Sequence, residues 1–141
     1  MKKILLSLLI VSITSVAQSA TCANGAGKAF LGNDGKTYYC ESNVRMNWWS
    51  AFTWCKSIDG ELVDINSECL KPGKQIKSCG SGECPCFQFT GNIPGYTAWT
   101  RNVLANNKAF LIQIWGIGNQ QKSSTSSAVC TMPDGWEPEE E

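Results

Sequence analysis

The feature that most constrains this chain is its cysteine content: there are eight Cys, and no His, in 141 residues. A chain of this length forms about one domain, whose core is small enough for covalent cross-links to matter. The missing His excludes Ser-His-Asp and Cys-His catalysis and any His-ligated metal site. What the cysteines do depends on the compartment, which the N-terminus indicates.

The first twenty residues have the pattern of a secretory signal peptide. Met1–Lys3 is positively charged, Ile4–Val16 is apolar, and small residues lead to a cleavage position after Ala20. The apolar run is shorter than the roughly 20 residues that span a bilayer, and no other segment qualifies. Cys22 raises the alternative of a lipoprotein signal, but Thr21 stands where a lipobox has Gly or Ala. We therefore expect a secreted or periplasmic protein without a membrane span.

An even number of cysteines in a small exported chain favours disulfides over free thiols. The run from Cys69 to Cys86 could bind zinc, but its spacings match no common zinc module, and thiols rarely stay reduced outside the cytoplasm. Cys84-Pro85-Cys86 could be a redox pair, but it is one residue shorter than Cys-x-x-Cys and has no βαβ context. We predict structural disulfides among all eight: Cys22, Cys40, Cys55, Cys69, Cys79, Cys84, Cys86 and Cys130.

The charges point away from nucleic acid and from catalysis. Lys and Arg number 12 and Asp and Glu number 12, so no basic field would attract nucleic acid. Asp64 and Glu68 could be paired catalytic carboxylates. A strand edge for Asp64 and a helix-start cap for Glu68 explain them better. Ser and Thr have no base partner, so we expect no enzyme activity and no cofactor.

The periodicity predicts one helix followed by short strands. In Asn47–Ser57 the apolar stripe of Trp48, Ala51 and Cys55 has helical spacing, with Asn47 as N-cap and Gly60 as stop. Residues 71–95 are rich in Gly, Pro and Cys and read as one stapled loop, and 133–141 read as an acidic, disordered tail. Strands are predicted in Leu62–Ile65, Tyr96–Thr100, Ala109–Trp115 and Ser127–Cys130, with a turn at Asn106-Asn107.

The six Trp and a polar strip are the candidate recognition residues. The spacing places Trp48, Trp54 and Trp99 in the core and leaves Trp49, Trp115 and Trp136 for the surface. The strip at 119–127 is polar and nearly uncharged, which suits either a hydrogen-bonding loop or a plain hairpin arm.

These segments, in this order, resemble the C-type lectin-like domain. The matching residues are Asn47–Cys55, Gly60–Ile65, Trp99, a hairpin over Lys108–Gln121 and Ala128-Val129-Cys130. The likeness runs from Tyr38 to Met132 and is closest to small exported bacterial members; Arg101 departs from it, since that family often has Gly there. The resemblance implies an α+β domain over 21–132, with one main helix packed on short antiparallel sheets.

The resemblance also implies disulfide pairings. In the family the helix Cys bonds to the Cys of the last strand, here Cys55 with Cys130, and an N-terminal hairpin disulfide would join Cys22 with Cys40. A Cys84–Cys86 bond would be strained because a single residue separates the two. Two arrangements therefore stay open: Cys69–Cys84 with Cys79–Cys86, or Cys69–Cys86 with Cys79–Cys84.

Sugar-binding members of the family coordinate calcium through acidic loop motifs, which this chain lacks. Asn92-Ile93-Pro94-Gly95 has no flanking acid, Trp115 is followed by Gly116-Ile117, and no Asp or Glu lies between Cys84 and Cys130. We therefore expect a non-catalytic binding or adhesion module that recognises a protein or glycan without calcium, through the face of residues 71–95 and 116–127. The alternative is a structural subunit of a bacterial envelope or surface appendage. The candidate ligand-binding residues are Trp115, Asn119, Gln121, Asn92 and Tyr96.

Overall fold

The chain is described here from a computed structural model, in which residues 20–80, 83–89 and 97–140 are placed. All of the predicted signal peptide except Ala20 lies outside the described residues. Neither helix in the described part of the chain has the length and apolarity needed to cross a bilayer. The domain is α+β, with four disulfides.

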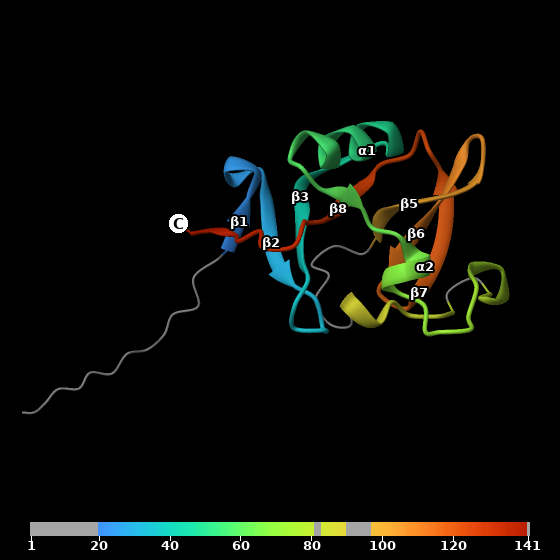
Figure 1. Cartoon of the computed structure of the whole chain (residues 1–141). Coiled ribbons are helices and arrows are strands. Elements are labelled where there is room, and N and C mark those ends of the chain that lie inside the picture. The colour runs from blue at the N-terminus through green and yellow to red at the C-terminus, as the bar shows by residue number, and fades with distance from the viewer. Residues whose placement is uncertain (1–19, 81–82, 90–96, 141) are drawn as a thin grey trace, which may run out of the picture.

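One mixed sheet organises the described residues (Figure 1). Eight of its nine strands follow the order β7-β6-β5-β8-β3-β2-β1-β9, and β4 pairs with β8 beside this path. The strands are β1 (Ala20–Cys22), β2 (Gly27–Leu31), β3 (Tyr38–Met46), β4 (Glu61–Leu62), β5 (Thr97–Ala105), β6 (Lys108–Gln113), β7 (Gly116–Gln121), β8 (Ser126–Thr131) and β9 (Glu139–Glu140).

The single sheet corrects the prediction of several short antiparallel sheets. Strand β8 returns from the outer hairpin to the centre, where it pairs antiparallel with β3 and parallel with β5. Its residues Ser126–Val129 and Cys130 are buried, as a central strand with both faces covered requires. The last long strand therefore joins the N-terminal and C-terminal halves of the sheet, which no local pattern could reveal.

Helix α1 (Trp48–Ser57) covers one face of the sheet, as the stripe predicted. The Asn47 side chain accepts from the Ser50 backbone N–H at 2.9 Å, which satisfies a helix-start donor. Asp59, rather than the predicted Gly60, adopts the positive φ that follows the helix end. Buried residues of this face are Cys22, Cys40, Ala51, Cys55, Leu62, Trp99, Ala109, Leu111, Ala128, Cys130 and Met132.

The opposite face is covered by α2 (Ile65–Glu68) and by the stapled loop. Short 3₁₀ turns at Ile76–Ser78 and Phe87–Phe89 are the regular structure of that loop among its described residues. Buried residues of this face are Tyr39, Val63, Ile65, Cys69, Leu70, Cys86, Phe89, Ala98, Ile112, Ile117 and Val129. The sheet thus has an apolar layer on each face.

The disulfides hold these layers together. Cys55–Cys130 joins α1 to β8, and Cys22–Cys40 joins β1 to β3. Of the two arrangements left open by the sequence, the structure has Cys69–Cys86 with Cys79–Cys84. The first of these two bonds anchors the stapled loop to the end of α2, and the second closes its tip.

The C-terminal segment differs from the predicted disordered tail. The Trp136 ring lies edge-on to Tyr38 with centroids 5.7 Å apart, and β9 pairs with β1. The Asn24 backbone N–H donates to the Glu139 carboxylate at 3.0 Å. The acidic side chains do not prevent this packing, because backbone pairing and a single aromatic anchor fix the segment. The ordered domain therefore extends past 132 to β9.

Candidate functional site

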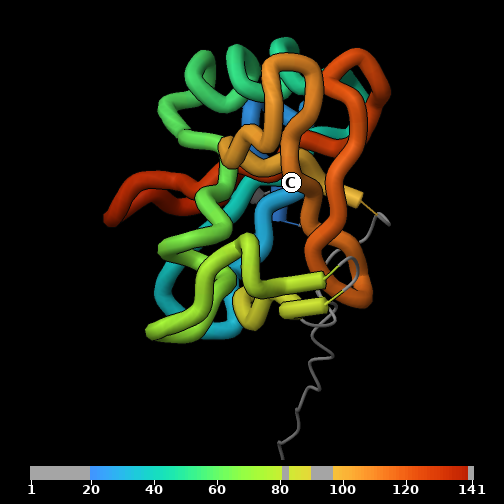
Figure 2. Tube along the Cα trace, turned by 90° about the vertical axis from the view of Figure 1, so that its right-hand side faces the viewer, coloured from blue at the N-terminus to red at the C-terminus, as the bar shows by residue number. Residues whose placement is uncertain are grey.

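The structure brings together the two segments that were predicted to form a recognition face. Glu83, at the tip of the stapled loop, forms a β-bridge to Ile117 in β7, whose N–H donates to the Glu83 carbonyl at 3.0 Å. Figure 2 looks onto this side of the molecule, where the described parts of the loop, residues 71–80 and 83–89, lie beside β6 and β7. The face is thus supported by the sheet on one side and by two disulfides on the other.

An apolar pair stands out from this face at the turn between β6 and β7. Ile114 is 51% exposed and Trp115 is 58% exposed, although both follow directly on a strand of the core sheet. Gly116 closes the turn with φ of 148°, a conformation that favours glycine. Large apolar side chains held in water by a short turn are typical of contact sites rather than of cores.

The remaining predicted residues lie along β7. Asn119 and Gln121 are exposed and two residues apart, so they point to the same side of the sheet. Asn119 is paired with Phe110 and Gln121 with Lys108. Because β7 has six residues at about 3.3 Å each, the row from Trp115 to Gln121 extends for roughly 20 Å. Asn92 and Tyr96 lie outside the described residues.

The residue pattern alone did not predict strand β7, since Gly116–Gly118 reads as a turn, but the resemblance implied it as the second arm of a hairpin over Lys108–Gln121. Its six residues all pair with β6. An added Cβ at Gly118 would come within 2.7 Å of the Gln113 side-chain oxygen. The Gln113 side chain therefore lies over Gly118, and a larger residue at position 118 would displace it.

A second aromatic surface occupies the N-terminal end of α1. The Lys122 Nζ lies 4.2 Å from the centroid of the Trp48 ring and 5.7 Å from that of Trp49. The Trp48 indole N–H donates to the Thr100 carbonyl at 2.9 Å and is half-buried, whereas Trp49 is 51% exposed. Trp49 is thus exposed, as the spacing predicted, and it packs edge-on against the half-buried Trp48.

The two candidate catalytic carboxylates serve local structure. Asp64 accepts from the Asn66 N–H at 3.1 Å and from the Asn102 amide at 3.0 Å, and it caps α2. Glu68 accepts from the Tyr39 hydroxyl and the Thr131 hydroxyl, each at 2.8 Å. Burial, reinforced by Glu68, raises the pKa of Tyr39 well above its usual range. Intramolecular donors thus engage both carboxylates. Asp64 is the N-cap of α2, where a strand edge was expected, and Glu68 accepts from the Asp64 backbone N–H at 3.0 Å, which fits the helix-start role expected of it.

One buried carboxyl was not predicted from the sequence. Glu41 on β3 is 4% exposed, and its Oε1 has no hydrogen-bond partner in the described part of the chain. Burial raises the pKa of Glu41, and a Ser127 hydrogen bond and the charge of Lys28 oppose that rise. No alternation rule predicts a glutamate at an inward position.

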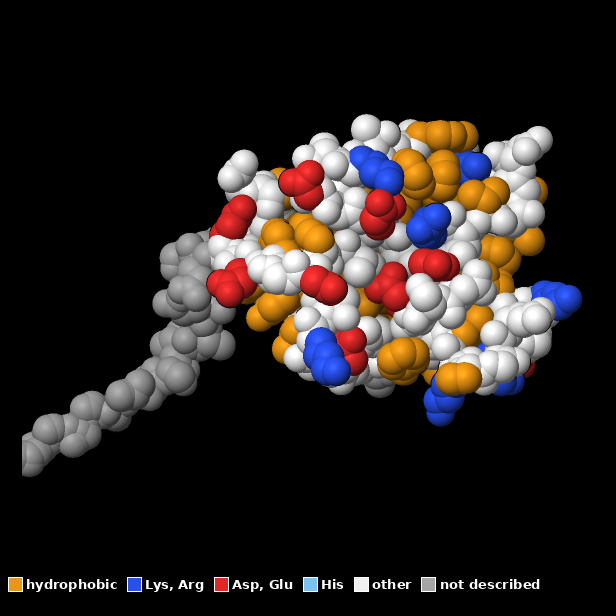
Figure 3. Space-filling model, viewed as in Figure 1, with side chains coloured by type: hydrophobic (Ala, Val, Ile, Leu, Met, Phe, Trp, Pro, Cys, Tyr) orange, Lys and Arg blue, Asp and Glu red, His pale blue; other side chains and the backbone are white. Residues whose placement is uncertain are grey.

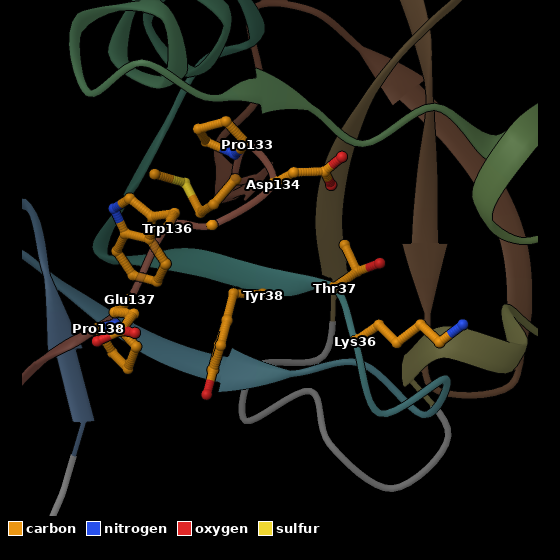
Figure 4. A pocket seen from close by; sticks show the side chains of 10 residues that line it. Lys36, Thr37, Tyr38, Pro133, Asp134, Trp136, Glu137 and Pro138 are labelled. Carbon is orange, nitrogen blue, oxygen red and sulfur yellow. The ribbon is translucent and has the colours of Figure 1, made fainter.

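A hollow that the sequence did not predict lies between β3 and the C-terminal segment (Figure 4). Its volume is about 430 Å³. It exists because the C-terminal segment folds back on Tyr38, which the prediction of a disordered tail excluded. Its lining residues are Lys36, Thr37, Tyr38, Met132, Pro133, Asp134, Gly135, Trp136, Glu137 and Pro138.

Metal chemistry has no ready site among the placed residues. In the ranges 20–80, 83–89 and 97–140, no group of three or more Cys, Asp or Glu side chains is arranged to hold a metal ion. Comparison with known protein families, with curated proteins and with solved structures finds no match to this chain.

Proposed function

We propose that this protein is an exported, non-catalytic binding or adhesion module that recognises a protein or glycan partner without calcium. The observation that carries the proposal is the exposed pair Ile114–Trp115, held at a tight turn beside the stapled loop. Tryptophan at a rigid position loses little conformational freedom on binding, so its contact area contributes efficiently to affinity.

The polar row on β7 complements this anchor. Asn119 and Gln121 offer uncharged amides that can donate and accept, which suits sugar hydroxyls and peptide groups alike. The row extends for roughly 20 Å, which favours an extended partner over a single small molecule. The face would thus combine one aromatic anchor with a hydrogen-bonding strip.

The C-type lectin-like identity is part of this proposal. It is supported by the Cys55–Cys130 bond between the helix and β8 and by the Cys22–Cys40 bond near the N-terminus. Calcium independence is supported by the lack of any Asp or Glu between Cys84 and Cys130, because a Ca²⁺ site needs several carboxylate oxygens.

Export to the periplasm or the medium is supported by the signal-like N-terminus and by the four disulfides. Disulfides form and persist in oxidising compartments and are rare in the cytosol.

A structural subunit of a bacterial envelope or surface appendage is the second candidate, and the outer edge of β7 favours it. The N–H of Ile117 points away from β6, and Asn119 has the same orientation because it lies two residues further along the strand. Such an edge can pair with a strand from another subunit. A subunit should self-associate in size-exclusion chromatography, whereas a binding module should elute as a monomer.

The test compares three proteins on a glycan array and on intact bacterial and host cells: the native chain, Trp115→Ser and Trp49→Ser. Trp49 is the matched control, because it is similarly exposed but lies on α1. We expect saturable binding by the native chain and by Trp49→Ser, at least tenfold weaker binding by Trp115→Ser, and no effect of EDTA. Equal binding by both variants, or equal loss in both, would refute the assignment of the face.

A further inference from the structure

We propose that the hollow beside Tyr38 and Trp136 is a second binding site, which accepts an organic ammonium ion. It lies away from the β7 face, and no residue of that face lines it. The proposal is independent of the partner of Trp115 and goes beyond the function proposed above. It rests on three properties of the hollow: its aromatic wall, its unpaired carboxylates and its negatively charged surroundings.

The aromatic wall is a corner made by two rings. The Tyr38 and Trp136 planes are inclined by 65°, with centroids 5.7 Å apart, and both side chains are half-buried. Figure 4 shows the two rings together on one side of the hollow. Inclined aromatic rings of this kind present negative π faces to one volume, which is how quaternary ammonium groups are recognised.

The carboxylates of the hollow are free to meet a cation. Asp134 and Glu137 are exposed, and among the described residues the one ion pair joins Lys56 to Glu61 instead. In Figure 4, Glu137 lies on the aromatic side, and Asp134 extends over the opposite side above Thr37. A ligand in the hollow would therefore find a carboxylate at each end.

The surroundings strengthen the preference for positive charge. An adjoining hollow shares Met132 and Pro133 and adds four more acidic side chains against one Arg. Figure 3 shows acidic side chains gathered across the middle of this face. The opposing charge within the first hollow is Lys36, which is exposed. Over the two hollows, six acidic side chains face two basic ones, and Lys56 pairs with one of the six, Glu61, so the local charge remains net negative. The four added acidic residues are Asp59, Glu61, Asp64 and Glu68, and the Arg is Arg101.

The site is already formed without a ligand. The Trp136 backbone N–H donates to the Pro133 carbonyl at 3.1 Å, and Gly135, with φ of 83°, closes that turn. Pairing of β9 with β1 fixes the segment on its far side. A hollow of about 430 Å³ is within the usual size of a small-molecule site and leaves room for a substituent beside a trimethylammonium group.

The test uses choline and its neutral isostere 3,3-dimethylbutan-1-ol, which has the same shape without the charge. Both are titrated into the native, ¹⁵N-labelled protein, and the indole N–H resonances of the tryptophans are followed by NMR. We expect choline to shift the Trp136 resonance saturably and the isostere to bind at least tenfold more weakly. Equal binding of the two probes, or no saturable shift with choline, would overturn the proposal.

Acidic and basic variants should change the affinity for choline in opposite directions, whereas damage to the fold would lower it in both. Asp134→Asn and Glu137→Gln should each weaken choline binding severalfold, while Lys36→Gln should strengthen it because it removes the opposing charge. Trp136→Ala should abolish binding, and retention of the other tryptophan resonances shows whether that variant is folded. Weakening by Lys36→Gln, or no change in either acidic variant, would contradict the proposal. Trp115→Ser should leave choline binding unchanged, so failure here and failure of the β7 face are separable.

Discussion

Removing the disulfides one at a time should lower the free energy of unfolding by very different amounts, because the bonds close loops of very different length. Cys55–Cys130 spans a sequence separation of 75, whereas Cys79–Cys84 spans 5. In the chain-entropy model the first restricts the unfolded chain by about 4.5 kcal/mol and the second by about 2 kcal/mol. Because Cys55 and Cys130 are fully buried and the other pair is half-buried, lost packing adds to the first figure only.

The paired variants Cys55→Ala with Cys130→Ala and Cys79→Ala with Cys84→Ala avoid free thiols that could reshuffle. Urea unfolding followed by tryptophan fluorescence gives the free energy of unfolding and the m-value for each. We expect the first variant to lose at least 2 kcal/mol more than the second and to show a larger m-value, since its unfolded state is less restricted. Equal losses, or a larger loss at the loop tip, would refute the view that the helix-to-sheet bond is the principal cross-link.

Three further predictions concern the core and calcium. Glu41→Gln should raise the free energy of unfolding at pH 7 by about 1 kcal/mol. The reason is that folding buries the Glu41 carboxyl, which is ionised at pH 7 in the unfolded chain, and leaves one of its oxygens without a hydrogen bond. Since the pKa of Glu41 is raised in the folded protein, this gain should disappear below the ordinary carboxyl pKa, where Glu41 is protonated in both states; equal thermal shifts at pH 7 and pH 3.5 would contradict it. Gly27→Ala should cost about 2 kcal/mol in urea unfolding, because the added Cβ would lie 2.9 Å from each sulfur of Cys22–Cys40, and a neutral result would show that the bond can move. EDTA should leave the melting temperature unchanged, and a fall that calcium reverses would reveal a site.

The local elements could be predicted because their signals lie within one turn or one hairpin. The α1 stripe, its Asn47 cap and the turn at Asn106-Asn107 each depend on neighbours in sequence. Strand β7 followed from the resemblance to a family with a hairpin there and not from its own residues, because two glycines and a run of amides carry no strand pattern; pairing with β6 stabilises it. The central position of β8 was not predicted for another reason: it depends on pairing with β3 and β5, which come from different halves of the chain.

The candidate sites differ in the same way: those set by local sequence could be predicted, and those set by distant segments could not. The exposure of Trp49 and Trp115 was predicted from the sequence, whereas Trp136, also expected at the surface, is half-buried against Tyr38. The hollow could not be predicted, since Tyr38 and Trp136 come from opposite ends of the chain and meet only when β9 pairs with β1. Charge and proline content indicated a solvated tail, and one half-buried aromatic contact together with the pairing of β9 outweighed both.

The central claim is that the turn at Trp115 contacts a partner. Replacing Trp115 with p-benzoylphenylalanine places a photo-crosslinker at that position, and the same replacement of Trp49 places one on α1 as a control. After irradiation on intact cells, we predict a discrete crosslinked species from position 115 that excess native protein suppresses and that position 49 does not yield. Identical products from both positions, or none from position 115 that the native protein can displace, would contradict the account.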